Sequence, residues 1–442
     1  MRGDTIFALA SGAGRAGVAV YRLSGPRARE TLSALTGRGL PEARRASRRI
    51  LRTPVGEILD DGLVLWFPGP ASFTGEDVVE LHLHGGRAVA QAVVDALLSL
   101  GLRPAEPGEF SRRAFEAGRM DLTQAEAIAD LVDAETAAQR RQALRQMEGG
   151  LARLYEEWRQ RLIRCQAHIE ADIDFSDEDL PDGLSTGAAA ELTSLQADIR
   201  AHLADGHRGE RLREGLAVAI LGAPNVGKSS LLNALSGRDA AIVSATAGTT
   251  RDVIEVHLDL GGYPVILADT AGLRDAVEPI EEEGVRRARA RAGDADLRLV
   301  LFDRGALPGL DAASLEWVDE RSLVVVNKCD DGGEDVPDRI GDRPVFALSV
   351  RTGEGLDGVI TALTAAARAA LESGGAPAIT RARHRVALEE AVMAIDRSLG
   401  GRMAELVAED IRMAMRAVGR ITGRVDVEDM LDVVFREFCI GK

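Results

Sequence analysis

Residues 222–229 have the types and spacing of a loop that binds nucleotide phosphates. They read Gly-Ala-Pro-Asn-Val-Gly-Lys-Ser, and the glycines allow backbone N–H groups to close around phosphate oxygens at the start of a helix. Lys228 can reach the β- and γ-phosphates, and the hydroxyl of Ser229 can hold Mg²⁺. An apolar run at 216–221 precedes the loop and a helix-like run follows it. The sequence therefore predicts a strand, a phosphate loop and a helix in the order that this chemistry requires.

Two motifs after the loop can complete a magnesium site. Residues 248–251 read Gly-Thr-Thr-Arg, and the hydroxyl of Thr250 can join the Mg²⁺ shell when a γ-phosphate is present. Residues 269–272 read Asp-Thr-Ala-Gly and follow an expected strand. Asp269 would hold the metal from its outer shell, and the N–H of Gly272 would sense the γ-phosphate. Both motifs thus predict residues that respond to the γ-phosphate.

Two later motifs can read the base. Residues 327–330 read Asn-Lys-Cys-Asp, and the carboxylate of Asp330 can accept both the ring and the exocyclic N–H groups of guanine, which adenine does not offer in that arrangement. Residues 349–351, Ser-Val-Arg, would then back the base. Each motif alone is a weak signal, but all five occur in order, each after an expected strand. The sequence therefore predicts a GTPase whose motif residues bind GTP: Asn225, Val226, Gly227, Lys228, Ser229, Ser230, Gly248, Thr249, Thr250, Asp269, Thr270, Ala271, Gly272, Asn327, Lys328, Asp330, Ser349, Val350 and Arg351.

The sequence lacks the usual groups that promote hydrolysis. Ras-like switches carry a water-orienting Gln directly after the second motif, and here that residue is Leu273, which cannot orient water by hydrogen bonding. The nearest candidates are Glu278 and the run 281–283. An acidic run also suits the start of a helix, and both interpretations stay open on physical grounds. No arginine finger is identifiable, which leaves the transition-state charge to another cation.

The composition is that of a soluble globular protein. A length of 442 residues gives a prior of about three domains, and 45% hydrophobic with 28% charged residues is ordinary. A net charge of −16 argues against a broad basic face for nucleic acid. The cysteines are far apart, which disfavours a zinc site and fits a reducing compartment. We expect the cytoplasm, because the sequence has no signal peptide and no apolar run long enough to span a bilayer.

Lysine is confined to a few positions in this chain. Of 54 basic residues, the lysines are Lys228, Lys328 and Lys442, and all others are arginine. An ammonium and a guanidinium differ in shape and hydration. Sites that demand an ammonium are the simplest account of the pattern, and two of these lysines lie in nucleotide motifs.

Hydrophobic patterns divide the chain into four parts. Residues 1–118 predict a mixed α/β domain. Residues 119–210 and 376–442 predict long helices that pack together, and residues 211–375 predict a nucleotide domain inserted between them. Strand candidates of this inserted domain alternate with helices and lie at 216–221, 254–260, 265–268, 297–302, 323–326 and 345–348. We therefore expect a doubly wound, mostly parallel sheet with one antiparallel edge pair.

Motifs outside the nucleotide domain resemble one family, the MnmE (TrmE) tRNA modification GTPases. The shared runs are 67–70 with 73–77 (Phe-Pro-Gly-Pro and Phe-Thr-Gly-Glu-Asp), 107–110 (Pro-Gly-Glu-Phe), 121–128 (Asp-Leu-Thr-Gln-Ala-Glu-Ala-Ile) and the terminal 438–442 (Phe-Cys-Ile-Gly-Lys). Residues 248–252 and 269–274 match as well. The resemblance covers essentially the whole chain. It implies a folate-binding-like N-terminal α/β domain, a helical domain and a Ras-like P-loop GTPase domain inserted into it.

The resemblance also implies a reaction and its partners. Members of the family work with a flavoprotein, MnmG, in a heterotetrameric complex that places a carboxymethylaminomethyl-type group on carbon 5 of the wobble uridine of certain tRNAs. The one-carbon unit comes from a 5-formyl or methylene tetrahydrofolate, and FAD belongs to the partner alone. The family forms a homodimer through its N-terminal domains and has no membrane association. Its GTPase domains meet when GTP, Mg²⁺ and K⁺ are present.

By similarity, K⁺ takes the place of the missing arginine finger. Its ligands would be Asn225 of the phosphate loop with Ser244, Thr246 and Thr249 of the next loop. That next loop would also contact GTP through Ser244, Ala245, Thr246 and Ala247. The family places its catalytic Glu before two residues and a Gly, and this pattern selects Glu281 within Ile-Glu-Glu-Glu-Gly, although its neighbours are also acidic.

By the same similarity, the folate pocket would be formed by Arg22, Glu80, Arg119 and Lys442. Arg119 departs from the lysine that the family pattern leads us to expect, which retains the charge but changes its shape. From the residues alone, Arg22 and Glu80 would be an ordinary surface ion pair. Cys439 resembles the functional thiol of the family, whereas a cysteine between Phe and Ile is more often a packed small hydrophobe.

A different class of function is the alternative. Regulatory or ribosome-assembly GTPases of the Era-like group share the nucleotide motifs. They append an RNA-binding module with a basic face, and the sequence offers none. A folate-dependent transferase with an inactive GTPase domain is a third reading, and the complete set of nucleotide motifs argues against it.

Overall fold

The computed structural model contains two compact units. Its described residues are 3–174, 184–237, 255–269, 292–331, 334–372, 374–401, 403–425, 428–436 and 438–441. One unit comprises Met1–Val132, Gln146–Leu195 and Glu390–Lys442, and the other comprises Asp133–Arg145 and Gln196–Glu389. The first holds a mixed α/β domain and long helices, and the second holds a mostly parallel sheet with the phosphate loop. The predicted fold class is confirmed, while the four-part domain boundaries stay a prediction.

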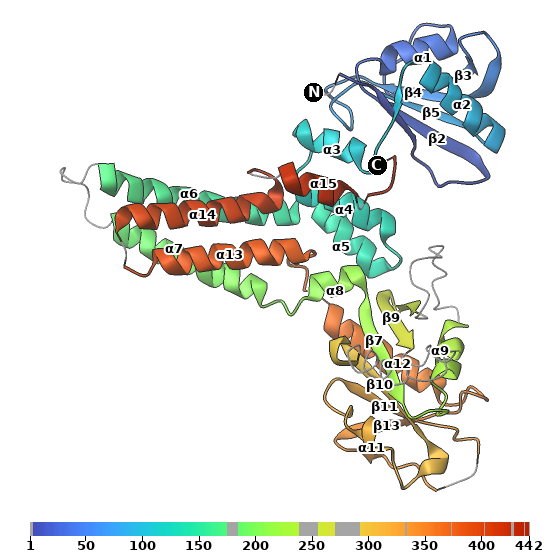
Figure 1. Cartoon of the computed structure of the whole chain (residues 1–442), viewed down its shortest axis with the longest axis vertical. Helices are drawn as coiled ribbons and strands as arrows, with labels where there is room; N and C mark the ends of the chain where they lie inside the picture. The colour runs from blue at the N-terminus through green and yellow to red at the C-terminus, as the bar shows by residue number, and fades with distance from the viewer. Residues whose placement is uncertain are drawn as a thin grey trace, which may run out of the picture. The chain divides into compact units, whose positions relative to one another are not determined.

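A six-stranded sheet organises the N-terminal domain. Its strands are β1 (Ile6–Leu9), β2 (Ala16–Ser24), β3 (Ser47–Arg52), β4 (Ile58–Phe67), β5 (Val78–Gly85) and β6 (Arg103–Pro104), in the order β3-β4-β5-β2-β1-β6. All neighbouring strands are antiparallel except β1 and β6. Helices α1 (Ala28–Thr36) and α2 (Arg87–Ser99) pack on the sheet over a single apolar core (Figure 1). In this strand order, β3 lies at one edge of the sheet.

Alternation along the strands gives this sheet one apolar and one polar face. In β5, Leu81 and Leu83 are at most 2% exposed, and the side chains of Glu80 and His82 between them are only partly buried. Because successive strand residues point to opposite faces, these polar side chains lie away from the helices. The register pairs Arg22 of β2 with Glu80, so polar groups from two central strands meet on one face.

Long helices form the rest of the first unit. They are α3 (Glu109–Glu116), α4 (Leu122–Asp133), α6 (Gly150–Asp174), α14 (Ala404–Thr422) and α15 (Glu428–Arg436), with parts of α5 (Ala137–Met147), α7 (Leu184–Leu203) and α13 (Ala382–Ser398). Helices α6 and α14 lie side by side (Figure 1). Residues of α6 at helical spacing, such as Tyr155, Trp158 and Leu162, are buried. The predicted packing of C-terminal helices on the earlier ones is thus observed for this pair.

A seven-stranded sheet organises the second unit. Its strands are β7 (Leu216–Gly222), β8 (Glu255–Leu260), β9 (Tyr263–Asp269), β10 (Leu297–Asp303), β11 (Ser322–Asn327), β12 (Arg339–Ile340) and β13 (Arg343–Ala347), in the order β12-β13-β11-β10-β7-β9-β8. The β8–β9 and β12–β13 pairs are antiparallel, and the other neighbouring strands are parallel. The described helices of this sheet are α8 (Arg208–Glu214), α9 (Lys228–Ser236), α11 (Ala312–Leu315) and α12 (Leu356–Leu371), with a 3-10 turn at Arg304–Ala306. The predicted parallel sheet with one antiparallel hairpin is confirmed, and β12 is an additional short strand.

Charged side chains are buried between the N-terminal sheet and α3. The side chain of Arg113 is 6% exposed and pairs with Glu109, Glu76 and Asp4 at 3.0, 3.0 and 2.9 Å. Arg103 reaches Glu109 and Asp4, both at 2.7 Å. Buried charges are costly unless they are paired. This ionic cluster therefore fastens the N-terminal segment, the loop before β5 and helix α3 to one another.

The ionic cluster also makes the stability of the domain depend on pH. Burial raises the pKa of Glu109, but hydrogen bonds from Arg103, the Glu106 backbone N–H and Arg113 outweigh it and hold that pKa below its usual value. A carboxyl group with a lowered pKa in the folded state stabilises the fold above its unfolded pKa, and this stabilisation is lost as the pH falls through the folded pKa. Acid therefore weakens the attachment of α3.

Arg113→Ala should destabilise the N-terminal domain by roughly 3–5 kcal/mol, because it removes the cationic partner of the largely buried Glu76 and one of the two arginines that pair with the buried Glu109. Urea unfolding followed by Trp66 fluorescence, with Trp158 and Trp317 replaced by Phe, would measure this. The neighbouring Arg112 pairs with exposed carboxylates, so Arg112→Ala should cost no more than about 1 kcal/mol. Equal losses in the two variants would contradict this account.

Candidate functional site

The phosphate loop joins the end of β7 to the start of α9. Gly222 and Gly227 have φ of +148° and +106°, and Asn225 has φ of +63°, which is the left-handed region. A Cβ at Gly222 would lie 2.5 Å from the backbone oxygen of Leu301 on β10. Glycine is thus required there by backbone shape and by the neighbouring strand. The loop presents its N–H groups at the helix N-terminus, where an anion binds best.

Lys228 opens α9 and lies over the loop. Its Nζ donates to the backbone oxygens of Gly222 and Ala223 at 2.8 and 2.9 Å. The following Ser229 is exposed, as is Asn225. The ammonium, the hydroxyl predicted for Mg²⁺ and the amide predicted for K⁺ therefore belong to one short loop.

Asn327 connects the phosphate loop to the predicted base-reading segments. It is 3% exposed, its Nδ2 donates to the backbone oxygen of Val226 at 2.8 Å, and its Oδ1 accepts from the N–H of Val350 at 3.1 Å. A Cβ at Gly227 would approach Asn327 Nδ2 to 2.3 Å. One buried amide thus holds three of the predicted motifs together.

The predicted guanine-reading carboxylate is kept ionised by its neighbours. A hydrogen bond from Ser349 and the charge of Arg351 lower the pKa of Asp330. Arg351 forms ion pairs with Asp330 and, at 3.2 Å, with Asp331. The structure thus brings Asp330, Ser349 and Arg351 together, with the guanidinium of Arg351 on the carboxylate that would bind the base.

Asp303 is a site residue that the sequence analysis missed. It ends β10 and its Oδ2 lies 2.5 Å from Nζ of Lys328, which has φ of +66°. Burial raises the pKa of Asp303, but hydrogen bonds from Lys328 and the N–H of Gly305 lower it below its usual value. Arg304 adds a hydrogen bond to the backbone oxygen of Cys329 at 2.8 Å. The feature of the sequence that could have identified Asp303 is its position as a carboxylate at the end of an apolar strand.

Several predicted site residues lie outside the described residues. These are Ser244, Ala245, Thr246, Ala247, Gly248, Thr249, Thr250, Thr270, Ala271, Gly272, Glu281 and Lys442, together with the side chain of Asp269. The predicted catalytic Glu, the Thr of the Mg²⁺ shell and most K⁺ ligands therefore stay predictions.

The N-terminal site is built around the pair of Arg22 and Glu80. Arg22 donates from Nε and Nη2 to Glu80 Oε1 at 3.1 and 3.0 Å, and His82 Nε2 lies 3.3 Å from the other carboxylate oxygen. The guanidinium lies 5.4 Å from the ring centre of Phe73 and 5.9 Å from that of Phe110. The two side chains are 23% and 18% exposed, so this is a half-buried constellation rather than an ordinary surface pair.

Arg119 lies beside the loop that carries Phe73. A Cβ at Gly75 would lie 3.8 Å from Cγ of Arg119, and the residue is exposed. Phe73, Phe110 and His82 were not assigned to the site from the sequence, although two of them lie in the motifs that carry the resemblance. Phenylalanine is usually a core residue, so nothing in the sequence led us to expect Phe73 and Phe110 beside a charged group.

The C-terminal tail, residues 438–441, is held against the N-terminal domain. Phe438 is 5% exposed in a cluster with Leu122 and Phe435, and the N–H of Gly108 approaches the backbone oxygen of Cys439 at 3.4 Å. Gly441 has φ of +100°, and a Cβ there would lie 2.4 Å from the Leu9 oxygen. The tail is therefore fixed on both sides of Cys439.

Cys439 is an exposed, free thiol. Burial raises the pKa of Cys165 to about 11, and burial likewise raises that of Cys329. A thiol reacts as its thiolate, so these two are poorly suited to chemistry. Exposure distinguishes Cys439 from the other cysteines and favours the functional interpretation over the packed one.

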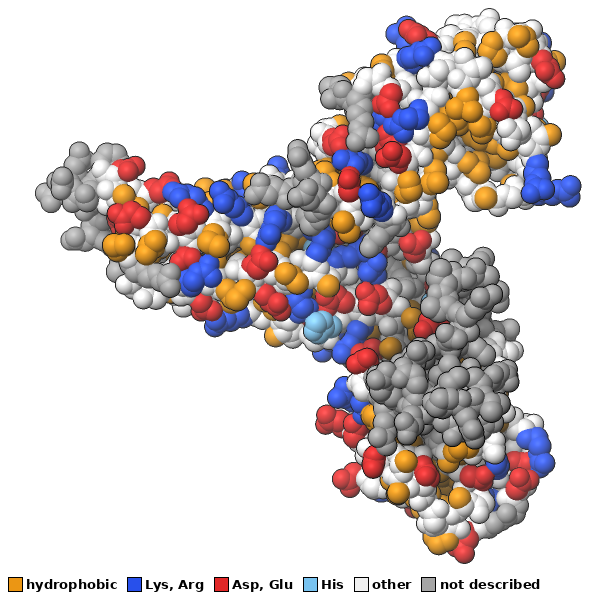
Figure 2. All heavy atoms as spheres, viewed as in Figure 1, with side chains coloured by type: hydrophobic (Ala, Val, Ile, Leu, Met, Phe, Trp, Pro, Cys, Tyr) orange, Lys and Arg blue, Asp and Glu red, His pale blue; other side chains and the backbone are white. Residues whose placement is uncertain are grey.

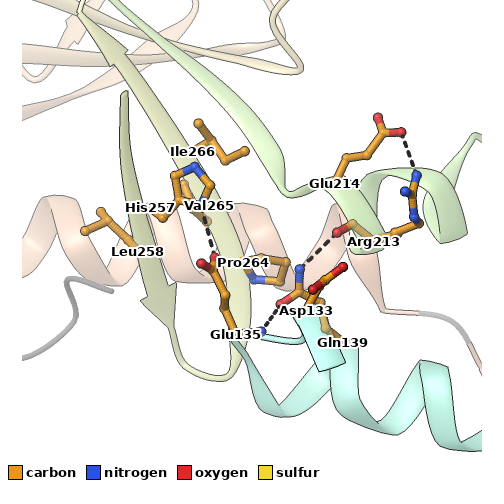
Figure 3. Close-up of a pocket in the computed structure, with 10 residues that line it drawn as sticks. All are labelled: Asp133, Glu135, Gln139, Arg213, Glu214, His257, Leu258, Pro264, Val265 and Ile266. Carbon is orange, nitrogen blue, oxygen red and sulfur yellow. Dashed lines mark hydrogen bonds and ion pairs between the residues drawn. The ribbon is translucent and has the colours of Figure 1, made fainter. Parts of the chain in front are cut away.

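A separate pocket of about 200 Å³ lies in the second unit, between the start of α5 and the β8–β9 hairpin (Figure 3). Glu135 Oε2 lies 3.0 Å from His257 Nδ1, and Gln139 Nε2 donates to the Arg213 oxygen at 3.0 Å. None of the predicted site residues lines it. The ion pair of Glu135 with His257 connects the segment before α5 to the β8–β9 hairpin. This hairpin lies between the two predicted γ-phosphate motifs in the sequence.

Comparisons with known proteins match the whole chain. A family model described as MnmE helical domain matches residues 122–439, and one described as GTP-binding protein TrmE N-terminus matches residues 5–119. The tRNA modification GTPase MnmE of Paramagnetospirillum magneticum is 63% identical over 99% of this chain and 100% of its own length. That of Rhodospirillum rubrum is 59% identical over 99% of each chain. Among solved structures, the G domain of the T. maritima FeoB iron transporter is 27% identical, covering 34% of this chain and 98% of that domain with a TM-score of 0.26.

Asn327→Ala should weaken GDP binding at least tenfold and destabilise the second unit by about 1–3 kcal/mol, because partners of the buried amide lose their hydrogen bonds. Titration with a fluorescent GDP analogue and thermal unfolding would measure the two effects. Asn233→Ala, at an exposed position of α9, is the matched control and should change neither. Unaltered GDP affinity in Asn327→Ala would show that the bridge does not shape the site.

Proposed function

Since this chain belongs to the MnmE (TrmE) family of tRNA modification GTPases, we propose that it places a carboxymethylaminomethyl-type group on carbon 5 of the wobble uridine of certain tRNAs. It does so with the flavoprotein MnmG, which carries the FAD, as a homodimer within a heterotetrameric complex. GTP hydrolysis drives the cycle. Among the described helices, none is both long and apolar enough to cross a membrane, and we propose a cytoplasmic location.

One observation carries the folate part of the proposal. Residues 107–110 contact both the predicted thiol segment and the predicted folate pair: Gly108 meets the backbone of Cys439, and the ring of Phe110 meets the guanidinium of Arg22. An exposed thiol and a half-buried Arg–Glu pair thus share one supporting segment. This arrangement supports a single site built from both ends of the chain.

The residues of that site have distinct roles in the proposal. Glu80 accepts N–H groups of a 5-formyl or methylene tetrahydrofolate, and Arg22, held by Glu80 and flanked by aromatic rings, orients it. Arg119 and Lys442 supply positive charge for its carboxylates. The folate, when bound, supplies the one-carbon unit. Cys439 provides the thiol next to it.

The GTPase part of the proposal assigns a role to each loop. Lys228 binds the β- and γ-phosphates, Ser229 and Thr250 hold Mg²⁺, and Asp330 reads guanine. Asn225, Ser244, Thr246 and Thr249 would hold K⁺, which would supply the charge that an arginine finger supplies in other GTPases. If GTP is hydrolysed at equal rates in K⁺ and in Na⁺, these residues are not K⁺ ligands.

The proposal also gives each of the four parts of the chain a role. Residues 1–118 serve dimerisation and folate binding, and residues 211–375 are the GTPase domain. Residues 119–210 and 376–442 are the first and second parts of the helical domain.

Glu281→Ala should lower the rate of GTP hydrolysis by at least about 100-fold, because Leu273 cannot orient the attacking water in its place. GTP affinity should stay unchanged. Single-turnover hydrolysis and GTP titration would measure the two quantities, with Glu282→Ala as the matched control. Full activity in Glu281→Ala together with loss in Glu282→Ala would move the role to the neighbouring carboxylate.

Mass spectrometry of tRNA nucleosides tests the proposed function. Cells without this protein should lack the modification at carbon 5 of the wobble uridine, and the intact chain should restore it. Cys439→Ser should fail to restore it, whereas Cys329→Ser, at a less exposed cysteine, should succeed. If the modification is the same with and without the protein, the tRNA function is wrong. Restoration by Cys439→Ser would remove only the role of the thiol.

A further inference from the structure

Residues 38–52 carry a charge opposite to that of the whole chain. The segment holds six arginines and one glutamate, a net charge of +5, within a chain of net charge −16. It runs from the end of α1 along β3, the edge strand of the N-terminal sheet. On the face drawn in Figure 2, by contrast, positive and negative side chains are interspersed over the helices. We call residues 38–52 the basic edge.

Arginines of the basic edge line a shallow cleft of about 300 Å³. Arg38, Arg48, Arg49 and Arg52 contribute to its wall, and Asp61 is the one carboxylate there. Asp61 is already paired with Arg48 at 2.6 Å. Positive charge therefore exceeds negative charge in the cleft, which suits an anion.

One buried donor in the cleft points to a missing acceptor. The Nε of Arg49 is buried and has no hydrogen-bond partner within the described part of the chain. An unsatisfied buried donor costs about 1–3 kcal/mol, and more when it is charged. A phosphate oxygen in the cleft would supply the acceptor, and guanidinium groups bind phosphate through two parallel hydrogen bonds.

The shape of the basic edge fits an extended polyanion better than a single phosphate. Arg48 and Arg52 lie on one face of β3, four residues apart and so about 13 Å along the strand. Arg45 and Arg48 have side chains that are 73% and 79% exposed. Arg45 does not line the cleft, so the exposed guanidinium groups of the basic edge extend beyond it.

Protection of an edge strand is the alternative reason for such charges. Native sheets place charged side chains on edge strands to prevent edge-to-edge pairing. That purpose concerns the strand itself. It does not account for Arg38, Arg44 and Arg45, which lie outside β3, or for a cleft with a buried unsatisfied donor.

We propose that the basic edge binds the sugar–phosphate backbone of tRNA. The inference deepens the proposed function and rests on tRNA being the substrate. The overall negative charge of the chain disfavours tRNA elsewhere on its surface, and the basic edge provides the local attraction that this charge otherwise denies. Binding of this kind is electrostatic, so its affinity falls steeply with salt.

The test compares charge reversals on and off the basic edge. Binding of an unmodified tRNA transcript is measured by filter retention at several KCl concentrations, without GTP, folate or partner. Arg45→Glu with Arg52→Glu should weaken binding at least tenfold and reduce the slope of log affinity against log salt by about 1.4–1.8, because two phosphate contacts are lost. Arg321→Glu with Arg368→Glu, at exposed positions of the second unit, is the control and should match the wild type.

Three results would overturn the proposal. These are unchanged affinity and slope in the variant of the basic edge, no binding of tRNA by the unaltered chain, and loss of binding to the flavoprotein with tRNA binding intact. GTP hydrolysis and the mass in solution verify that the variants are folded. Failure of the proposed function itself would show separately, because the binding assay requires no modification chemistry.

Discussion

The docking of residues 438–441 on the N-terminal domain is the constraint on which the candidate site around Arg22, Glu80 and Cys439 depends. Gly441 passes so close to Leu9 that any side chain would collide with its backbone oxygen, and Phe438 is buried one residue before Cys439. These two contacts fix the backbone on either side of the thiol without covering it. The two ends of the chain thereby meet at residues 107–110, and Phe110 of that segment also contacts Arg22.

Both candidate sites use one buried polar centre to hold several loops. In the N-terminal domain the ionic cluster around Arg113 connects the loop before β5 to α3, which carry the two rings beside Arg22. In the second unit the amide of Asn327 connects the phosphate loop to the segment of Val350. Loops have few apolar contacts of their own, so a buried hydrogen-bonding centre is an effective way to order them. Substrate-binding groups can then stay exposed.

The sequence was most informative where chemistry and local backbone shape coincide. The phosphate loop and the strands of the nucleotide domain follow from glycine spacing and apolar runs, and the structure has them within a few residues of the predicted bounds. Contacts between distant segments were not visible: Arg113 with Glu76, or Lys328 with Asp303, join residues whose proximity depends on the whole fold. Side-chain size is also a poor guide to burial in α13, where Met393 is 54% exposed and the small Ala391 and Ala394 are buried, because close helix packing favours small side chains.

The most direct test of the docked tail is hydrogen–deuterium exchange of the C-terminal peptide together with binding of 5-formyltetrahydrofolate. Gly441→Val should release the tail, speed exchange at residues 439–441 and weaken folate binding at least tenfold. Gly401→Val is the control, since Gly401 also has a positive φ, +72°, but has open space around it. If Gly441→Val leaves exchange and folate affinity as in the unaltered chain, the two ends of the protein do not build one site.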